Sequence, residues 1–134
     1  MSDLVVNLLT PEGAVFGDKV SMALVPGTKG EMGILPDHIP LIFKLEPGIV
    51  TIYDGSKVVE KKFVFGGFGR VCGGELNIMA DRVGEVDELK VDDARKELTQ
   101  LEQDILKIED KAQYKETENR ANICRKIIEV AGKG

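Results

Sequence analysis

The only histidine of the chain limits the catalytic chemistry that the sequence could support. A serine or cysteine nucleophile needs a base within hydrogen-bond reach, and His38 would have to be that base. His38 lies in the turn Pro36-Asp37-His38-Ile39-Pro40, with no nucleophile motif beside it. We interpret it as a structural or interfacial residue, and we predict that the chain has no catalytic residues and is not an enzyme.

The two cysteines and the many carboxylates do not form a recognisable metal or disulfide pattern. Cys72 and Cys124 lie far apart, sit in no CxxC pair and have only His38 as a fellow ligand. We predict two buried free thiols in a reducing compartment. The carboxylates after residue 85 alternate with lysines and arginines, which is typical of a solvated helix face, and we predict no metal site.

Two glycine clusters resemble phosphate loops at first sight. They are Gly27, Gly30 and Gly33, and then Gly66, Gly67 and Gly69. Neither cluster has the Gly-Lys-Ser/Thr ending that reaches phosphate and magnesium, and neither opens a helix pattern. We therefore predict that these glycines serve turns and close strand packing.

Length and charge narrow the class of partner. A chain of 134 residues holds one sizeable core or two small ones. The net charge of −5, without a lysine run, argues against a nucleic-acid or lipid surface and favours a protein partner. The sequence has no signal-peptide pattern and no apolar run near the roughly 18 residues of a spanning helix, so we expect neither secretion nor membrane insertion.

A change of composition near residue 85 divides the chain. All five prolines and thirteen of the fifteen glycines come earlier, and only Gly132 and Gly134 come later. Glycine and proline punctuate strands and turns, whereas a long helix requires their absence. We predict two domains, residues 1–85 and 86–134.

Short apolar runs between turn signals predict strands in the first domain. Some alternate with period two: Glu75 and Asn77 point one way, and Leu76, Ile78 and Ala80 the other. Many short strands separated by such turns predict an antiparallel sandwich or barrel. The predicted strands are 4–9, 20–25, 49–53, 58–65 and 76–80.

Two apolar seams predict two helices in the second domain. The first contains Val91, Ala94, Leu98, Leu101, Ile105, Ile108 and Ala112, and the second contains Tyr114, Thr117, Ala121, Cys124, Ile128 and Ala131. One straight helix would place the seams on opposite sides, because two residues rotate a helix by about 200°. We predict an antiparallel hairpin that folds back within 110–115. Since its seam is short and rich in small residues, we also expect a second arrangement of the two helices.

One segment resembles a known family. Residues 24–41 read Leu-Val-Pro-Gly-Thr-Lys-Gly-Glu-Met-Gly-Ile-Leu-Pro-Asp-His-Ile-Pro-Leu. This segment is similar to the signature of the epsilon subunit of bacterial and plastid F-type ATP synthases, which is called delta in mitochondria. Residues 45–50, 65–68 and 76–81 follow in the order that this family has, so the resemblance covers residues 4–95, while the hairpin matches in pattern only.

The resemblance implies a fold, partners and contact residues. It implies a sandwich of about ten strands that grips the gamma subunit and rests on the c-ring, followed by a hairpin that can extend toward the catalytic alpha and beta subunits and restrain ATP hydrolysis. By position, the loop from Lys29 to His38 would contact the c-ring and the foot of gamma. The implied contact residues are Lys29, Gly30, Glu31, Gly33, Ile34 and His38. The alternative is an exposed turn without a partner.

A second motif implies a regulatory nucleotide. Some bacterial members bind ATP at Ile/Leu-Asp-x-x-Arg-Ala, and residues 91–96 read Val-Asp-Asp-Ala-Arg-Lys. Asp92 and Arg95 match this motif, and Lys96 replaces the alanine. The alternative is structural, because a carboxylate in the first turn of a helix is favoured by the helix dipole and can pair three residues later.

Three functions stay open at this point. They are a rotor subunit held by gamma and the c-ring, a nucleotide-sensing module, and a small hydrolase. The resemblance favours the first, without a cofactor other than ATP as a regulatory ligand. It places the subunit peripherally on the cytoplasmic face of a bacterial inner membrane, and the missing transit peptide favours a bacterial or organelle-encoded chain.

Overall fold

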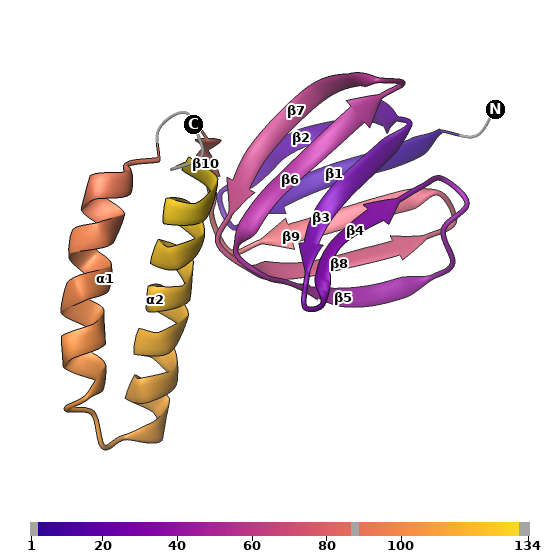
Figure 1. The fold of residues 1–134 in the computed structure, drawn as a ribbon. Helices are drawn as coiled ribbons and strands as arrows, with labels where there is room; N and C mark the ends of the chain where they lie inside the picture. Colours follow the sequence, from indigo (N-terminus) through magenta and orange to yellow (C-terminus); the bar gives the residue numbers. More distant parts are fainter. Residues whose placement is uncertain (1–2, 87–88, 132–134) are drawn as a thin grey trace. The chain divides into compact units, whose positions relative to one another are not determined.

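The computed structural model describes residues 3–86 and 89–131, and the chain divides into two compact units, Met1–Val86 and Asp87–Gly134. In the described residues, strands occupy the first unit and helices the second (Figure 1). The strands are β1 (Leu4–Thr10), β2 (Gly13–Val20), β3 (Met22–Gly27), β4 (Gly30–Ile34), β5 (Leu41–Leu45), β6 (Gly48–Asp54), β7 (Lys57–Val64), β8 (Gly67–Cys72), β9 (Glu75–Ala80) and β10 (Val83–Glu85).

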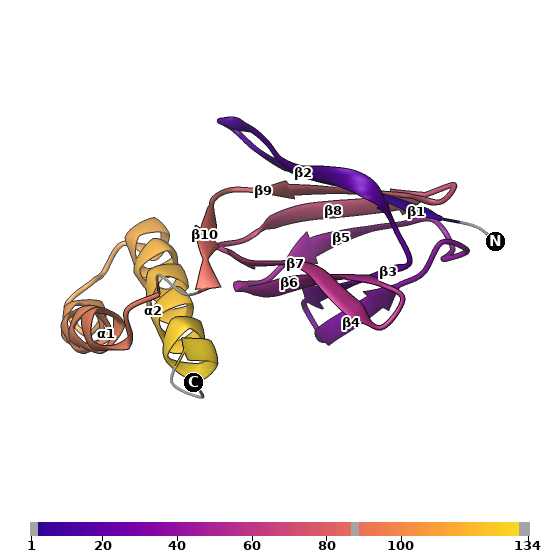
Figure 2. The ribbon, with the colours of Figure 1, turned by 90° about the horizontal axis from the view of Figure 1, so that it is seen from above.

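The strand unit is a ten-stranded sheet folded into two layers, in the order β10-β7-β6-β3-β5-β8-β9-β1-β2, with β4 paired to β3. Figure 2 shows one layer with β5, β8, β9, β1 and β2 and the other with β7, β6, β3 and β4. The layers are joined at β3 and β5, which share the single pair Gly27 and Leu45. This architecture confirms the predicted sandwich, with one correction: β1 and β9 run parallel.

The sandwich core follows from period-two alternation. On β9 the side chains of Leu76, Ile78 and Ala80 are buried, while Glu75 and Met79 are exposed and Asn77 is half-buried. The same alternation on β1 buries its even-numbered residues from Leu4 to Leu8. Inward side chains from both layers form one apolar cluster, which is the main stabilising feature of the unit.

Hydrophobic runs alone did not reveal every strand. The predicted strand 20–25 coincides with β3 over residues 22–25, but its start is wrong, because β2 ends at Val20 and β3 begins at Met22. Ser21 between them donates its hydroxyl to the Tyr53 carbonyl (3.0 Å) and accepts the Gly55 amide (2.7 Å), which fixes the bend. Strands β2, β4, β8 and β10 were not predicted from apolar runs, because they are rich in glycine and polar residues or very short. Strand β5 was missed although it reads Leu-Ile-Phe-Lys-Leu, which is an apolar run.

The helical unit is an antiparallel hairpin of α1 (Val91–Ile105) and α2 (Lys111–Ala131), as predicted. The chain turns slightly before the predicted segment, within residues 106–110. The carboxylate of Asp110 accepts the amides of Ala112 (2.7 Å) and Gln113 (3.3 Å), so it caps the second helix. An aspartate therefore terminates the turn where glycine and proline are absent.

The two helices share a small core. Its buried residues are Ala94, Leu101, Ala121 and Cys124, with Leu98, Ile127 and Ile128 packed against them. Ala112 and Tyr114, which were expected in the seams, are exposed because they lie at the open end of α2 beside the turn. No helix of the described residues is long and apolar enough to cross a membrane.

The prediction of two buried thiols holds for one of them. Cys124 is buried in the helical core, but Cys72 is exposed. The prediction for Cys72 is wrong because burial alternates along β8, and the even-numbered residues of this strand from Phe68 to Cys72 face outward. Sequence neighbours alone did not show which side of this short strand is covered.

Candidate functional site

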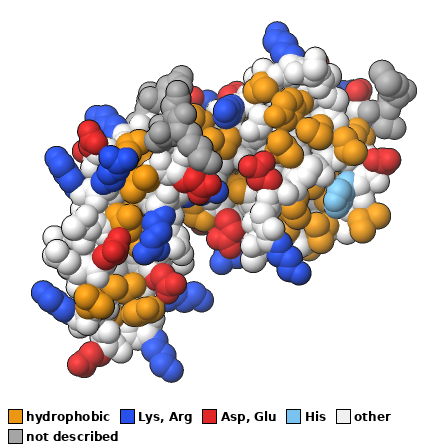
Figure 3. All heavy atoms as spheres, viewed as in Figure 1, with side chains coloured by type: hydrophobic (Ala, Val, Ile, Leu, Met, Phe, Trp, Pro, Cys, Tyr) orange, Lys and Arg blue, Asp and Glu red, His pale blue; other side chains and the backbone are white. Residues whose placement is uncertain are grey.

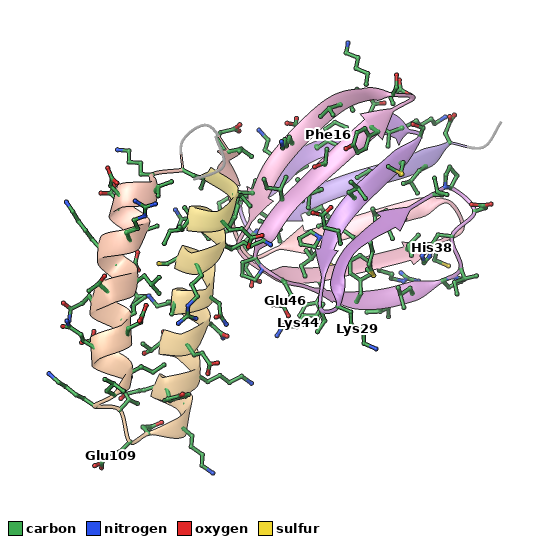
Figure 4. The ribbon with its side chains drawn as sticks, viewed as in Figure 1. Phe16, Lys29, His38, Lys44, Glu46 and Glu109 are labelled. Carbon is green, nitrogen blue, oxygen red and sulfur yellow. The ribbon has the colours of Figure 1, made fainter. Side chains whose placement is uncertain are left out.

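The segment from Lys29 to His38 is not a single loop. Residues 30–34 form β4, which pairs with β3 through Glu31 and Pro26, so Lys29 lies in the turn between these strands. Figure 4 shows Lys29 and His38 at opposite ends of β4. A five-residue strand is roughly 16 Å long, so the structure separates Lys29 and Glu31 from His38.

The predicted contact residues differ in accessibility. Lys29, Gly30, Glu31 and Gly33 are exposed, and His38 is half-buried. The Ile34 side chain is fully buried in the sandwich core and therefore supports β4 from inside. The sequence signature thus mixes surface positions with a core position.

His38 lies in a turn with an apolar surface. Its amide donates to the Leu35 carbonyl (3.0 Å), and its Nδ1 donates to the Ile39 carbonyl (2.7 Å), which orients the ring. The side chains of Leu35 and Ile39 are exposed, and Figure 3 shows the imidazole at the surface with hydrophobic side chains nearby. The turn thus offers a contact surface, with Nδ1 already engaged by the backbone.

A charged rim lies at the other end of β4. Figure 4 shows Lys29, Lys44 and Glu46 at this end of the strand unit. The Glu46 amide donates to the Pro26 carbonyl (2.9 Å), which ties the β5–β6 turn to β3 close to Glu31. We use "rim" for Lys29, Glu31, Lys44 and Glu46. Lys44 and Glu46 were missed because they come from another turn of the chain.

An exposed apolar surface lies on the layer that contains β5, β8, β9 and β1. Ile42, Phe68 and Met79 are 72%, 57% and 49% exposed. Strand register places Phe68 beside Met79, and Met79 beside Leu9. We use "outer face" for the outward side chains of these four strands apart from Lys44 of the rim, which are Val5, Asn7, Leu9, Ile42, Phe68, Arg70, Cys72, Glu75, Asn77 and Met79.

The outer face has shallow hollows between its side chains. One of about 400 Å³ is lined by Leu9, Thr10, Pro11, Phe68, Met79, Ala80 and Asp81. Another of about 330 Å³ is lined by Pro40, Leu41, Ile42, Arg70, Val71 and Cys72. An apolar surface with such relief is typical of protein interfaces. Sequence reasoning missed it because its side chains come from four short strands that are brought together only by pairing.

The glycine clusters have structural roles, as predicted. Gly67 has a φ of +132°, and a Cβ there would collide with the backbone of Met79 and Ala80. A Cβ at Gly69 would overlap the Phe43 ring, which fills the space above the glycine. These two glycines let β8 pack closely with its neighbours.

Asp92 lies in the first turn of α1, as the structural alternative expects, but among the described residues it does not pair with Arg95. Asp92 and Asp93 are in the first turn of α1, and both Asp92 and Arg95 are exposed. No ion pair joins these two side chains in the described part of the chain. Arg120 instead binds Glu97 (3.0 Å), and nucleotide binding at Asp92 and Arg95 stays a prediction.

The sequence of the chain is similar to known proteins that contain the same sandwich domain. Residues 3–86 match the family model described as ATP synthase, Delta/Epsilon chain, beta-sandwich domain. The chain belongs to this family. It is 36% identical over 92 residues to the ATP synthase epsilon chain of Rhodospirillum rubrum, covering 69% of each chain. It is 33% identical over 102 residues to the Gluconacetobacter diazotrophicus epsilon chain, covering 76% of this chain and 72% of the relative.

Solved structures of this family's complexes share the fold over both units. A chain of the Euglena gracilis mitochondrial ATP synthase, in a structure of OSCP, F1 and c-ring, matches with a TM-score of 0.80 and 22% identity. That match covers 95% of this chain and 80% of the other. A chain of the Tetrahymena thermophila mitochondrial ATP synthase central stalk and c-ring matches with a TM-score of 0.74 and 17% identity over 96% of both. At these identities the likeness concerns the fold alone.

Proposed function

We propose that this chain is a non-catalytic rotor subunit of a proton-translocating F-type ATP synthase, which couples a c-ring to a gamma subunit. The exposed outer face carries the proposal, because Ile42, Phe68 and Met79 expose apolar side chains on one layer of the sandwich. The family relationship supplies the complex in which such a surface has a partner. The outer face is the gamma-binding surface.

Surface complementarity supports this assignment. Burial of large apolar side chains at the centre of an interface dominates affinity, and aromatic residues contribute most. Phe68 lies between Lys44 of β5 and Met79 of β9, so it has a neighbouring strand of the outer face on each side. A partner that covers Phe68 and Met79 also covers the hollow beside Leu9.

The test is reassembly of the full-length chain with ATP synthase membranes stripped of it. We expect Phe68→Ser with Met79→Ser to weaken rebinding at least about tenfold and to lower ATP-driven proton pumping in proportion. The matched control is Val58→Ser with Val59→Ser, which changes two exposed aliphatic residues of β7. Unchanged rebinding by the outer-face variant would disprove this gamma-binding surface.

The rim is the c-ring contact in this proposal. Lys29, Glu31, Lys44 and Glu46 offer both charges at one end of the sandwich, which suits the polar loops of a ring. Because β4 separates this end from His38, the two parts are tested separately. We expect Glu31→Ala to reduce pumping more than rebinding, whereas His38→Ala affects rebinding. Identical effects of both variants would disprove this division.

The hairpin is the regulatory part in this proposal, and it acts by restraining ATP hydrolysis near the alpha and beta subunits. Its small core supports the idea, because an interface built on Ala94, Ala121 and Cys124 leaves two arrangements within a few kcal/mol. Complexes rebuilt with a chain truncated after Val86 should hydrolyse ATP faster than complexes with the full chain. Equal rates, with the truncated chain still bound, would exclude restraint by the hairpin.

ATP is a candidate ligand of this regulatory part. The family motif at Asp92 and Arg95 supports it, and both side chains are accessible on α1. Equilibrium dialysis with radiolabelled ATP tests the site, and Asp92→Ala and Arg95→Ala should each lower the affinity at least about tenfold if the motif binds nucleotide. Binding that is absent, or unchanged in both variants, would exclude the site.

A further inference from the structure

Arg70 lies in the middle of the outer face. It projects from β8, with Ile42 of β5 on one side and Asn77 of β9 on the other. Its side chain is exposed, and its neighbours along β8 on the same side are Phe68 and Cys72. The other charged side chains near Arg70 on this layer are Lys44, paired with Phe68, and Glu75, which lines the same hollow as Arg70.

The polar groups beside Arg70 are bound to one another. Asn7 donates its amide to the Asn77 carbonyl oxygen (3.0 Å), and Asn77 donates its amide to the Glu75 carboxylate (3.1 Å). The side-chain ion pairs of the described residues involve Lys62, Arg120 and Lys126 as cations, and Arg70 is in none of them. The nearest carboxylate on β9 is thus directed to an amide, and Arg70 has no anionic partner in the described chain.

Arg70 also borders two hollows into which a partner group could enter. The hollow of about 330 Å³ lies on the side of Ile42, and a second of about 200 Å³ is lined by Arg70, Cys72, Glu75 and Asn77. Both sides of the guanidinium are therefore accessible. A planar guanidinium presents its donors as a fork, which matches a carboxylate through two parallel hydrogen bonds.

Docking of a partner on Ile42 and Phe68 would remove water from Arg70, which is paired with Ile42 and lies two residues from Phe68 on the same side of β8. An unpaired charge in a dry interface opposes binding strongly. We propose that Arg70 binds an Asp or Glu carboxylate of the gamma subunit, and that this ion pair sets the register of docking. The inference rests on the proposed gamma-binding role of the outer face.

The experiment measures rebinding of full-length variants to stripped ATP synthase membranes at low and high salt. We expect Arg70→Ala to weaken rebinding at least about tenfold, Arg70→Glu to weaken it further, and Arg70→Lys to restore only part. The salt dependence of rebinding should be smaller for Arg70→Ala than for the unchanged chain. Lys61→Ala is the matched control, since it removes an exposed cation from β7.

Two comparisons separate this inference from the proposed function. If the double variant Phe68→Ser with Met79→Ser rebinds normally, the outer face is not the gamma-binding surface, and that part of the proposed function is overturned. If that variant is impaired but Arg70→Ala and Arg70→Glu rebind within about twofold of the unchanged chain, only the ion pair is overturned. Because Arg70 makes no side-chain hydrogen bond or ion pair within the described residues, its variants should retain the circular dichroism spectrum and melting temperature.

Discussion

In the strand unit, large aliphatic side chains such as Leu8, Ile52 and Ile78 are fully buried, whereas three of the four buried residues in the hairpin are Ala94, Ala121 and Cys124. Burial stabilises by about 0.8 kcal/mol per methylene group, so the small residues of the hairpin contribute little each. The outer face of the strand unit nevertheless leaves Phe68 and Met79 exposed. The core and the proposed gamma-binding surface thus occupy opposite sides of the same strands, while the hairpin has only a narrow core.

The largest expected effect is on the core of the strand unit. Ile78→Ala should lower the free energy of unfolding by about 2–5 kcal/mol, because it removes buried methyl groups and leaves a cavity. Urea denaturation followed by far-ultraviolet circular dichroism measures it. Met79→Ala is the control on the same strand, since Met79 faces outward. Equal destabilisation by both variants would contradict the assignment of the two sides.

Leu101 tests whether the hairpin core is independent of the sandwich core. Among the described hairpin residues it is the one large aliphatic side chain that is buried, so Leu101→Ala should cost about 2–3 kcal/mol and lower the helical signal at 222 nm. Melting of the strands, followed by hydrogen exchange of β1 and β9 amides, should stay unchanged. The exposed Leu106→Ala is the control. A parallel loss of strand protection would show that both units unfold together.

The cap of α2 should have a smaller effect. Asp110→Ala removes the acceptor of the Ala112 and Gln113 amides, and we expect a loss of about 1 kcal/mol in hairpin stability. Asp110→Asn keeps an acceptor and should retain most of the stability, while Glu109→Ala should have little effect. Thermal melting followed at 222 nm measures all three. An alanine variant as stable as the asparagine variant would argue against the cap.

Each unit contains one cysteine, so the reactivity and the titration of the thiols can be compared between the two units. Burial, together with the nearby Glu97 carboxylate, raises the pKa of the Cys124 thiol. Because the thiol loses its proton less readily in the folded hairpin than in the unfolded chain, the hairpin has its full stability below the ordinary thiol pKa of 9.0. This contribution to stability is lost as the pH rises through the raised pKa of the folded state. The hairpin should therefore melt at a slightly lower temperature at about pH 10 than at neutral pH, and Cys124→Ala should reduce this difference.

Labelling rates give a direct reading of the same contrast. At neutral pH the exposed Cys72 should react with a thiol reagent much faster than Cys124, whose reaction needs opening of the hairpin. Mass spectrometry of the labelled chain separates the two sites. Equal labelling rates of the two thiols would mean that the hairpin core does not protect Cys124 from the reagent.

Local sequence patterns predicted the main elements where burial and periodicity coincide. The alternation of residues 75–80 predicted β9, and the spacing of Ala94, Leu98 and Leu101 predicted the buried side of α1. The resemblance around residues 24–41 predicted the family and the number of strands. The weakest predictions concerned strands with few apolar residues, such as β2 and β4, whose pairing partners supply the stabilisation that their own sequences lack.

By itself, the sequence determined the two-part organisation, the hairpin and the sandwich, because glycine, proline and apolar periodicity act over a few neighbouring residues. Only the tertiary structure decided which surface is available to a partner. Strand pairing brings Leu9, Phe68 and Met79 together from distant positions and separates Lys29 from His38 despite their nearness in sequence. Among the described residues it also leaves Arg70 without an anionic partner, while Glu75 binds an amide. Such relations depend on register and strand direction, which local composition does not encode.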